Sequence, residues 1–313
     1  MSKRLLIDAR QIEETRVITT TNDIIDDFEY EVHSRRQLKG NIYLARVTRV
    51  EPSLQAAFIE YGGNRQGFLA FSEIHPDYYR IPVEDKKKLI AEASAQTDED
   101  LKLIENINED SALDYNEEDL KKVKKSLYRN YKIQEVIARR QILLVQVVKE
   151  ERGTKGAALT TYISIAGRYC VLMPNTPRGG GVSRKIANIT DRKRLKKVVD
   201  ELDVPTGMAV IVRTAGSKRT KTEIKRDYSN STSIWENVKN LTLESNAPFL
   251  IHEEGSLVKR AIRDLYHSDI NEVLVDGNEA YKTCKNYMKS LMPSHAKKVQ
   301  QYNDDKNPLF QKY

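Results

Sequence analysis

Two phenylalanines, Phe58 and Phe68, occupy positions where exposed aromatic rings could bind a ligand. The stretch EPSLQAAFIEYGGNRQGFLAF, residues 51–71, reads as two strands around the turn Gly62-Gly63-Asn64. Because side chains alternate between the two faces of a strand, the aliphatic residues share one face and both phenylalanines share the other with polar residues. We expect a core face of Ala57, Ile59, Tyr61, Leu69 and Phe71, and an opposite face of Ala56, Phe58, Glu60, Gln66, Phe68 and Ala70.

Outward aromatic rings beside basic side chains can hold a nucleic acid. Bases stack on exposed rings at about 1–3 kcal/mol each, while lysine and arginine bind the phosphates. The sequence offers four basic residues for this role, namely Arg46, Arg49, Arg65 and Lys155. A second interpretation stays open, in which another part of the chain or a partner subunit covers the two rings.

The charge of the chain is uneven. The 313 residues carry a formal net charge of +7. Residues 91–120 hold eleven acidic side chains and one lysine, so the remainder carries +17. A body this basic suits a polyanionic partner such as nucleic acid, although a basic soluble protein without such a partner has the same composition.

Composition also bears on the compartment. No run of about 18 apolar residues predicts a membrane span, and the N-terminal MSKRLLIDARQ lacks the apolar segment of a secretory signal. Cys170 and Cys284 are too few for a thiolate zinc site and are typical of reduced intracellular thiols. We therefore expect a cytoplasmic protein.

Secondary-structure patterns divide the chain. Residues 3–36 alternate apolar and polar positions and predict strands, and residues 37–161 predict a small antiparallel β-barrel. A charged segment at about 80–135, low in aliphatic residues, interrupts the barrel pattern. It predicts a mobile insertion, and a docked subdomain is the alternative.

The pattern beyond residue 162 is mixed. Strands are predicted in GRYCVLMP, MAVIVRTAG, APFLIHEE and EVLVDG, and NTPRGGGVSRKI predicts a glycine-rich loop. TDRKRLKKVVDEL predicts a helix with Thr190 as N-cap and an apolar stripe of Leu195, Val198, Val199 and Leu202. Further helices are predicted over residues 233–243, with Ile234, Val238 and Leu241 on one face, and in VKRAIRDLY.

Long collinear blocks resemble the ribonuclease E/G family of bacterial endoribonucleases, more closely its ribonuclease E branch. NIYLARVTRVEPSLQAAFIEYGGNRQGFLAFSEI resembles the S1 RNA-binding domain of that family, and KEERGTKGAALTTYISIAGRYCVLMPNTPRGGGVSRKI, VIVRTAG and APFLIHEE match further blocks. The resemblance covers the chain except about 80–135. It implies an α+β multidomain fold: an RNase H-like subdomain at 1–36 and 259–313, an inserted OB-type S1 barrel at 37–161, and a mixed α/β 5′-sensor subdomain at 162–258.

The resemblance also implies two sets of site residues. Phe58, Phe68 and Lys155 match the aromatic and basic residues that hold RNA on the S1 surface. Gly167, Val171, Arg213 and Thr214 match a pocket for the 5′-monophosphate of an RNA. A guanidinium offers a planar fork of donors that suits phosphate oxygens, although a salt bridge to a nearby carboxylate is an alternative role for Arg213.

Catalysis, by this resemblance, belongs to residues outside the chain. The family cleaves single-stranded RNA, in mRNA decay and in rRNA and tRNA processing, with paired aspartates that hold Mg²⁺ in a DNase I-like domain. A CPxC-type motif binds Zn²⁺ and links subunits. Both follow the segment that matches NPLFQKY, so we expect this chain to be inactive alone, to have no catalytic residue and to bind no metal. Four aspartates near the N-terminal strands are expected to be solvated turn residues: Asp8, Asp23, Asp26 and Asp27.

The expected partner is single-stranded, 5′-monophosphorylated RNA. For the full-length enzyme, the resemblance implies a homotetramer and contacts with degradosome proteins. Two alternatives stay open: a stand-alone, non-catalytic S1-type RNA-binding module, and a structural protein whose basic surface meets an acidic protein.

Overall fold

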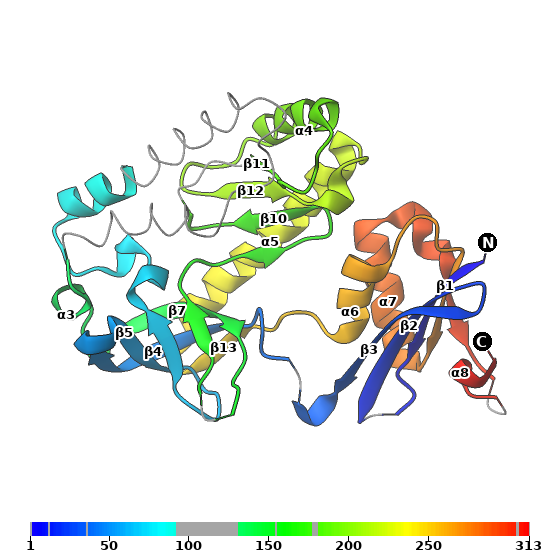
Figure 1. Cartoon of the computed structure of the whole chain (residues 1–313), viewed down its shortest axis with the longest axis horizontal. Helices are drawn as coiled ribbons and strands as arrows, with labels where there is room; N and C mark the ends of the chain where they lie inside the picture. Colours follow the sequence, from blue (N-terminus) through cyan, green and yellow to red (C-terminus); the bar gives the residue numbers. More distant parts are fainter. Residues whose placement is uncertain are drawn as a thin grey trace. The chain divides into compact units, whose positions relative to one another are not determined.

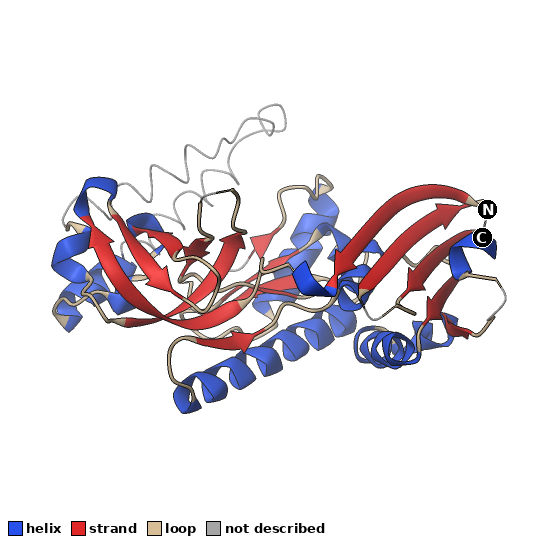
Figure 2. Ribbon diagram, turned by 90° about the horizontal axis from the view of Figure 1, so that it is seen from below, coloured by secondary structure: helices blue, strands red, loops and turns tan. Residues whose placement is uncertain are grey.

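The computed structural model describes residues 2–11, 13–35, 37–91, 131–153, 155–176, 181–304 and 307–312 as a mixed α/β protein (Figures 1 and 2). Most of the expected insertion, residues 92–130, and residues 177–180 of the glycine-rich loop lie outside the described residues. The flanks of the insertion are helical at residues 83–91 and in α3 (Ile133–Val136).

Two compact units make up the chain. The first comprises Met1–Gln37, Thr222–Asp227 and Glu254–Tyr313, and the second comprises Leu38–Lys221 and Tyr228–Glu253. The second unit contains both the barrel region and most of the expected sensor region. The division into three subdomains stays a prediction.

The second unit contains a closed five-stranded β-barrel. Its strands are β4 (Ile42–Glu51), β5 (Ala56–Glu60), β6 (Gly67–Ala70), β7 (Ile142–Lys149) and β8 (Ala158–Thr160). Around the barrel the order is β4-β5-β6-β8-β7, and β7 pairs back with β4. All neighbours are antiparallel except β6 and β8, which are parallel. This closure is consistent with the predicted OB-type barrel.

Apolar side chains from every barrel strand fill its interior. Val47, Ile59, Leu69, Leu143 and Leu159 are all buried in one cluster. Helix α3 adds Ile133 and Val136 to the same cluster. An additional strand, β13 (Phe249–His252), pairs with the first residues of β4.

A smaller sheet in the same unit positions the expected sensor residues. Its order is β11 (Gly181–Val182), β12 (Ala209–Val212), β10 (Cys170–Met173) and β9 (Ile165–Ala166). Helix α4 (Ile189–Asp200) packs against it through Leu195, Val198 and Val199, as the stripe predicted. The predicted N-cap Thr190 is wrong: the Asn188 side chain accepts a hydrogen bond from the Asp191 amide and caps the helix two residues earlier.

Helix α5 (Lys221–Glu244) begins twelve residues before its predicted start at Ser233. Its first turns carry few apolar side chains, but Ile224 among them is fully buried. In the predicted stripe of this helix Val238 is buried, whereas Leu241 is exposed. The first turns of α5 therefore depend on tertiary packing, because the apolar periodicity of the sequence indicates only the second half of the helix.

The first unit is a five-stranded mixed sheet with helices. The strand order is β15 (Val299–Tyr302), β14 (Glu272–Asp276), β1 (Lys3–Asp8), β2 (Glu14–Thr21) and β3 (Ile24–Val32). β15, β14 and β1 are parallel, and β1, β2 and β3 are antiparallel. The helices are α6 (Leu257–Arg260), which continues as a π-helical turn over Ala261–Leu265, α7 (Asn278–Leu291) and α8 (Leu309–Lys312).

Glu31 on β3 anchors α6 within this unit. Its carboxylate accepts hydrogen bonds from the Leu257 amide and from the Arg260 guanidinium, each at 3.1 Å. Both charged side chains are largely buried, so each needs the other as a partner.

Short 3₁₀ turns connect these elements. They are η1 (His33–Arg35), η2 (Pro52–Leu54), η3 (Phe71–Glu73), η4 (Pro76–Tyr78), η5 (Thr214–Gly216) and η7 (Pro293–Lys298). Among the described residues, no helix has both the length and the apolar character to cross a bilayer. Both cysteines are buried thiols outside any disulfide among the described residues, and burial raises the pKa of the Cys284 thiol to about 12.

Candidate nucleic-acid interface

Phe58 and Phe68 lie directly opposite each other on the outer face of the barrel. They pair in register between β5 and β6, and their ring centroids are 6.2 Å apart at an interplanar angle of 78°. Both rings are half-buried. Their neighbours in the sequence, Ala57, Ile59 and Leu69, are buried and face the core. The predicted facing of the two phenylalanines is confirmed.

Ala56 departs from the predicted alternation. It was expected on the outer face, yet it is fully buried. Helix α3 contacts this end of the barrel, where the Ile133 amide donates to the Gln55 side chain at 3.2 Å.

A β-bulge brings Arg49 onto the aromatic face. Val47 pairs with Ile59 and Arg49 pairs with Phe58, so Thr48 is the extra residue. The Thr48 hydroxyl donates to the Phe58 carbonyl at 2.9 Å. The Arg49 guanidinium lies 4.5 Å from the centroid of the Phe58 ring, within the range of a cation–π contact.

The other basic candidates have different surroundings. Arg65 and Lys155 are exposed, as a phosphate-binding role requires. Arg46 is half-buried, and its guanidinium donates to the Ala247 carbonyl at 2.8 Å. Arg46 therefore ties the segment before β13 to β4, a structural contact that the sequence pattern did not indicate.

Close backbone contacts hold Lys155 near β6. Its amide and carbonyl both hydrogen-bond to Arg152, at 3.0 and 3.1 Å, across a tight turn. A Cβ atom on the adjacent Gly156 would lie 1.9 Å from the Gln66 carbonyl oxygen, so only glycine fits there. The Phe68 amide in turn donates to the Ala157 carbonyl at 2.7 Å.

Tyr61 and Glu151 fix the turn between β5 and β6. The Glu151 carboxylate accepts from the Tyr61 hydroxyl at 2.9 Å and from the Arg65 amide at 3.1 Å. Burial, together with this carboxylate, raises the pKa of Tyr61 well above its ordinary value, so the hydroxyl stays a donor. This network holds the hairpin that carries both phenylalanines.

The second set of expected residues gathers at the end of the small sheet. The Arg213 guanidinium donates to the Gly167 carbonyl at 2.7 Å, and the Arg213 amide donates to the Tyr169 carbonyl at 2.8 Å. Val171 is half-buried on β10 and pairs with Ile211 on β12. Thr214 is exposed and begins η5. The structure thus brings Arg213 and Gly167 into direct contact, with Val171 on the neighbouring strand.

Two arginines of α4 support the loops beside this cluster. Arg194 donates to the carbonyls of Ser217 and Arg219, the latter at 2.9 Å, directly after η5. Arg192 donates to the Ser183 and Ile186 carbonyls at 2.9 and 3.2 Å. Sequence reasoning missed both roles, because a basic residue on the polar side of a helix is usually solvated.

Gly216 allows the turn after Thr214 to pack closely. A Cβ atom there would lie 2.8 Å from a Val212 methyl group and 2.9 Å from the Tyr169 carbonyl oxygen. The guanidinium groups of Arg168 and Arg219 lie 5.4 and 5.5 Å from the centroid of the Tyr169 ring.

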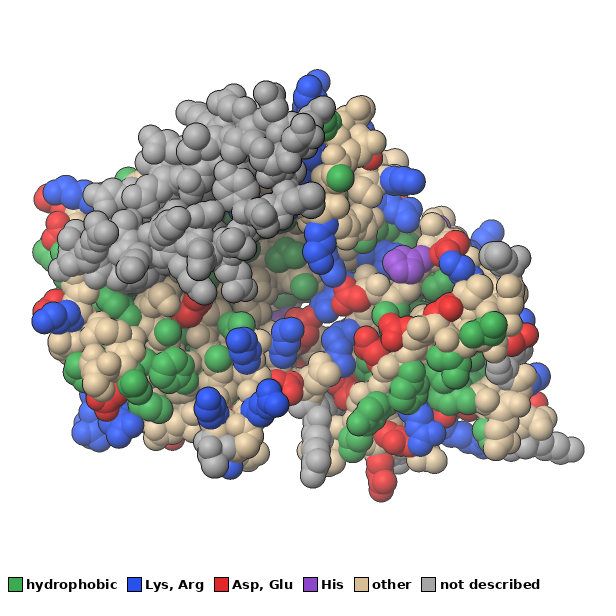
Figure 3. All heavy atoms as spheres, in the orientation of Figure 1, with side chains coloured by type: hydrophobic (Ala, Val, Ile, Leu, Met, Phe, Trp, Pro, Cys, Tyr) green, Lys and Arg blue, Asp and Glu red, His purple; other side chains and the backbone are tan. Residues whose placement is uncertain are grey.

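Acidic and basic side chains interleave on the face of the described residues that Figure 3 shows. No group of three or more His, Cys, Asp or Glu side chains with a metal-binding arrangement exists within the described ranges. Asp23 pairs with Arg4, and Asp26 accepts from the Thr21 hydroxyl. The described residues therefore do not fit a Mg²⁺ or Zn²⁺ site.

Comparison with known proteins identifies relatives of the chain. Residues 164–313 match the model of the ribonuclease E/G family. Ribonuclease E of Haemophilus influenzae is 37% identical over 99% of the chain, and ribonuclease E of Escherichia coli K12 is 36% identical over 99%. Ribonuclease G of Escherichia coli K12 is 29% identical, also over 99%. The chain spans 29%, 25% and 55% of these three relatives, respectively.

Proposed function

This chain belongs to the ribonuclease E/G family, matched directly over residues 164–313, and on that premise we propose that it is an RNA-binding and 5′-end-sensing region of an endoribonuclease of this type. The observation that carries the proposal is the aromatic face of the barrel. Phe58 and Phe68 lie opposite each other, and the Arg49 guanidinium lies over the Phe58 ring.

On this face, unpaired bases stack on the two rings. Exposed arginine and lysine side chains bind the phosphates between them, with Lys155 at the turn beside β6. Single-stranded RNA fits because its bases are free to leave their neighbours, whereas the bases of a duplex are already stacked and paired.

The Arg213 cluster is the proposed 5′-phosphate pocket. A terminal monophosphate is a dianion near neutral pH, whereas each internal phosphodiester carries a single charge. The hydrogen bond to Gly167 holds the Arg213 guanidinium in one place, and Thr214 offers a hydroxyl next to it in the chain. Val171 supplies apolar lining on the adjacent strand. Such preorganised donors favour the more highly charged 5′ end.

The first unit is the proposed RNase H-like scaffold, supported by its mixed five-stranded sheet and associated helices. Cleavage is proposed for residues outside this chain, where Mg²⁺ would supply the metal chemistry of phosphodiester hydrolysis in the family. The 313-residue chain should therefore bind RNA without cutting it. The cytoplasm, a homotetramer and degradosome contacts stay proposals for the complete enzyme.

Salt dependence of RNA binding tests this function. The affinity for a single-stranded oligonucleotide labelled at its 3′ end is measured by fluorescence anisotropy over a range of salt concentrations. A nucleic-acid site loses affinity steeply, with a logarithmic slope of about −0.7 per phosphate contacted. A flat salt response, or no binding at all, would reject the RNA-binding role in favour of a protein partner.

Cleavage is followed in the same samples after Mg²⁺ is added. Intact RNA is the expected result. Product formation that co-purifies with the folded chain through successive columns would place catalytic groups inside it. The stand-alone RNA-binding module differs from our proposal in one respect: it predicts equal affinity for RNA with and without a 5′-phosphate.

A further inference from the structure

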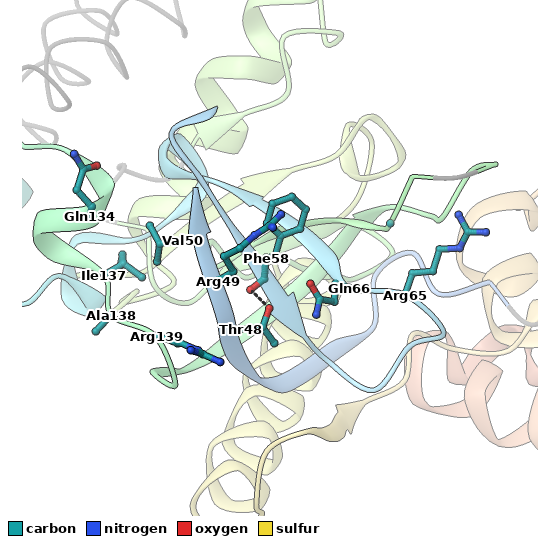
Figure 4. A pocket seen from close by; sticks show the side chains of 11 residues that line it. Thr48, Arg49, Val50, Phe58, Arg65, Gln66, Gln134, Ile137, Ala138 and Arg139 are labelled. Atoms are coloured by element: carbon teal, nitrogen blue, oxygen red, sulfur yellow. Dashed lines mark hydrogen bonds between the residues drawn. The ribbon is translucent and has the colours of Figure 1, made fainter. Parts of the chain in front are cut away.

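A groove of about 1010 Å³ opens beside Phe58 on the barrel (Figure 4). One wall comes from β4 and its bulge, one from β5 and the turn before β6, and one from α3 with the residues that follow it. We call it the arginine groove, after the three arginines among its lining residues: Arg49, Arg65 and Arg139. Its volume is at the upper end of the range for pockets that bind small molecules, so a nucleotide fits inside.

The charge of the arginine groove is uniform. Among the described residues that line it, none carries a carboxylate. All three arginines are exposed, and in the described part of the chain none of their guanidinium groups forms an ion pair. A lining of described residues that carry only positive charges is a candidate site for an anion.

The far wall is rigid. The Arg80 amide donates to the Val136 carbonyl at 2.9 Å, and the Gln141 side chain bonds to the Tyr78 carbonyl at 2.7 Å and the Ala138 amide at 3.1 Å. Ile137, which follows α3, is buried in the barrel core. Gln134 and Arg139 are therefore exposed side chains on a fixed backbone, which lowers the entropy cost of binding a ligand.

The near wall is continuous with the aromatic pair. Phe58 belongs both to the groove and to the pair, and Arg49 lies over its ring. Gln66 lies on the Phe58 side of the groove, and Gln134 lies across from it (Figure 4). Their amide groups offer both donors and acceptors, as the edges of unpaired bases require.

We propose that the arginine groove is a second RNA subsite, which takes the nucleotide next to the one stacked on Phe58 and Phe68. Arg49 and Arg139 bind its flanking phosphates, and the base enters between Gln66 and Gln134. The occupant is single-stranded RNA, so this inference rests on the proposed function. It extends the RNA path from the aromatic pair toward α3, a direction that neither the aromatic residues nor the 5′-phosphate pocket indicates.

Two adjacent arginines provide a matched test. Arg139 lines the groove, whereas its neighbour Arg140 is also exposed but is not among the lining residues. Arg139→Gln and Arg140→Gln remove the same charge at almost the same place. Binding is measured with a 5′-hydroxyl RNA of about 12 nucleotides, a length that an OB-type fold covers. Because this RNA has no 5′-phosphate, the proposed 5′-phosphate pocket does not contribute to the measured affinities.

Arg139→Gln should lower the affinity about tenfold and make the salt slope shallower by about 0.7, the loss of one phosphate contact. Arg140→Gln should change the affinity less than about twofold and leave the slope unchanged. Both variants should melt at the wild-type temperature, because both side chains are exposed.

Equal effects of the two substitutions would overturn the subsite while leaving the proposed function standing, since the wild-type chain would still bind RNA. Absence of RNA binding by the wild type would overturn the function and the subsite together. The two failures are therefore distinguishable in one set of titrations.

Discussion

The Arg213 guanidinium donates a 2.7 Å hydrogen bond to the carbonyl oxygen of Gly167, a residue 46 positions earlier in the chain. The Arg213 amide binds the neighbouring Tyr169 carbonyl, so backbone and side chain of Arg213 both contact the same segment. This geometry fixes the direction of a cationic, planar group before any ligand arrives.

Arg213→Lys should remove most of the proposed preference for a 5′-monophosphate. Lysine keeps the charge but lacks the planar fork that can hold Gly167 and a phosphate together. Hydrogen bonds to charged groups contribute about 1.5–3 kcal/mol, so a preference of about tenfold should shrink to about twofold or less. Affinities for matched 5′-phosphate and 5′-hydroxyl oligonucleotides measure it. An equal loss toward both would make Arg213 a general phosphate contact or a structural residue.

Arg194→Met should loosen the loop that follows Thr214. The substitution keeps the aliphatic stem but removes the hydrogen bonds to the Ser217 and Arg219 carbonyls. Trypsin should then cleave after Lys218 and Arg219 several-fold faster, as followed by mass spectrometry. Arg192→Met is the control, since Arg192 holds residues 183 and 186 instead. The same cleavage rate in both variants would contradict a local role for Arg194.

Phe58→Ala and Phe68→Ala should each weaken RNA binding with a small change in melting temperature. Loss of one stacking ring costs about 1–3 kcal/mol, or roughly five- to a hundred-fold in affinity. Phe71→Ala is the matched control, because that ring is buried against Tyr79 at 5.3 Å and its removal opens a cavity costing about 3–5 kcal/mol of stability. If Phe58→Ala destabilised the fold as much as Phe71→Ala, Phe58 would be a core residue.

Acidification should destabilise the second unit through His75. Burial lowers the pKa of His75, while the Asp77 carboxylate acts in the opposite direction. The His75 Nδ1 accepts from the Asp77 amide at 3.2 Å, as the neutral ring can. The unfolded chain then binds more protons below about pH 6.5, so stability is present above that pH and falls as the pH drops through it.

The slope contributed by His75 is at most about 1.4 kcal/mol per pH unit. His75→Asn keeps a side-chain acceptor for the Asp77 amide but cannot titrate in this range. Melting temperatures from pH 7.5 to 5.5 should fall less steeply in the variant than in the wild type. Parallel curves for the two proteins would show that other groups carry the acid sensitivity.

Local periodicity predicted the local structure well. Alternation alone placed Phe58 and Phe68 opposite the core-facing Ile59 and Leu69, and the spacing of Leu195, Val198 and Val199 predicted the buried side of α4. Both patterns depend on neighbours only a few residues away, which a sequence displays directly.

The features that the sequence did not predict depend on contacts between residues far apart in the chain. The bulge at Thr48, which turns Arg49 outward, depends on the pairing of β4 with β5. The Arg46 guanidinium donates to the carbonyl of Ala247, 201 residues away. The wall of the groove that carries Arg139 is held by the hydrogen bond between Gln141 and Tyr78. Each contact joins residues whose individual types give no signal of a partner.

The affinities of the wild-type chain for two single-stranded RNAs that differ only at the 5′ end decide whether the chain senses that end. We expect the 5′-monophosphate RNA to bind about tenfold more tightly than the 5′-hydroxyl RNA, because the Arg213 cluster is preorganised for a dianion. Equal affinities would contradict 5′-end sensing and leave the chain as an RNA-binding barrel alone.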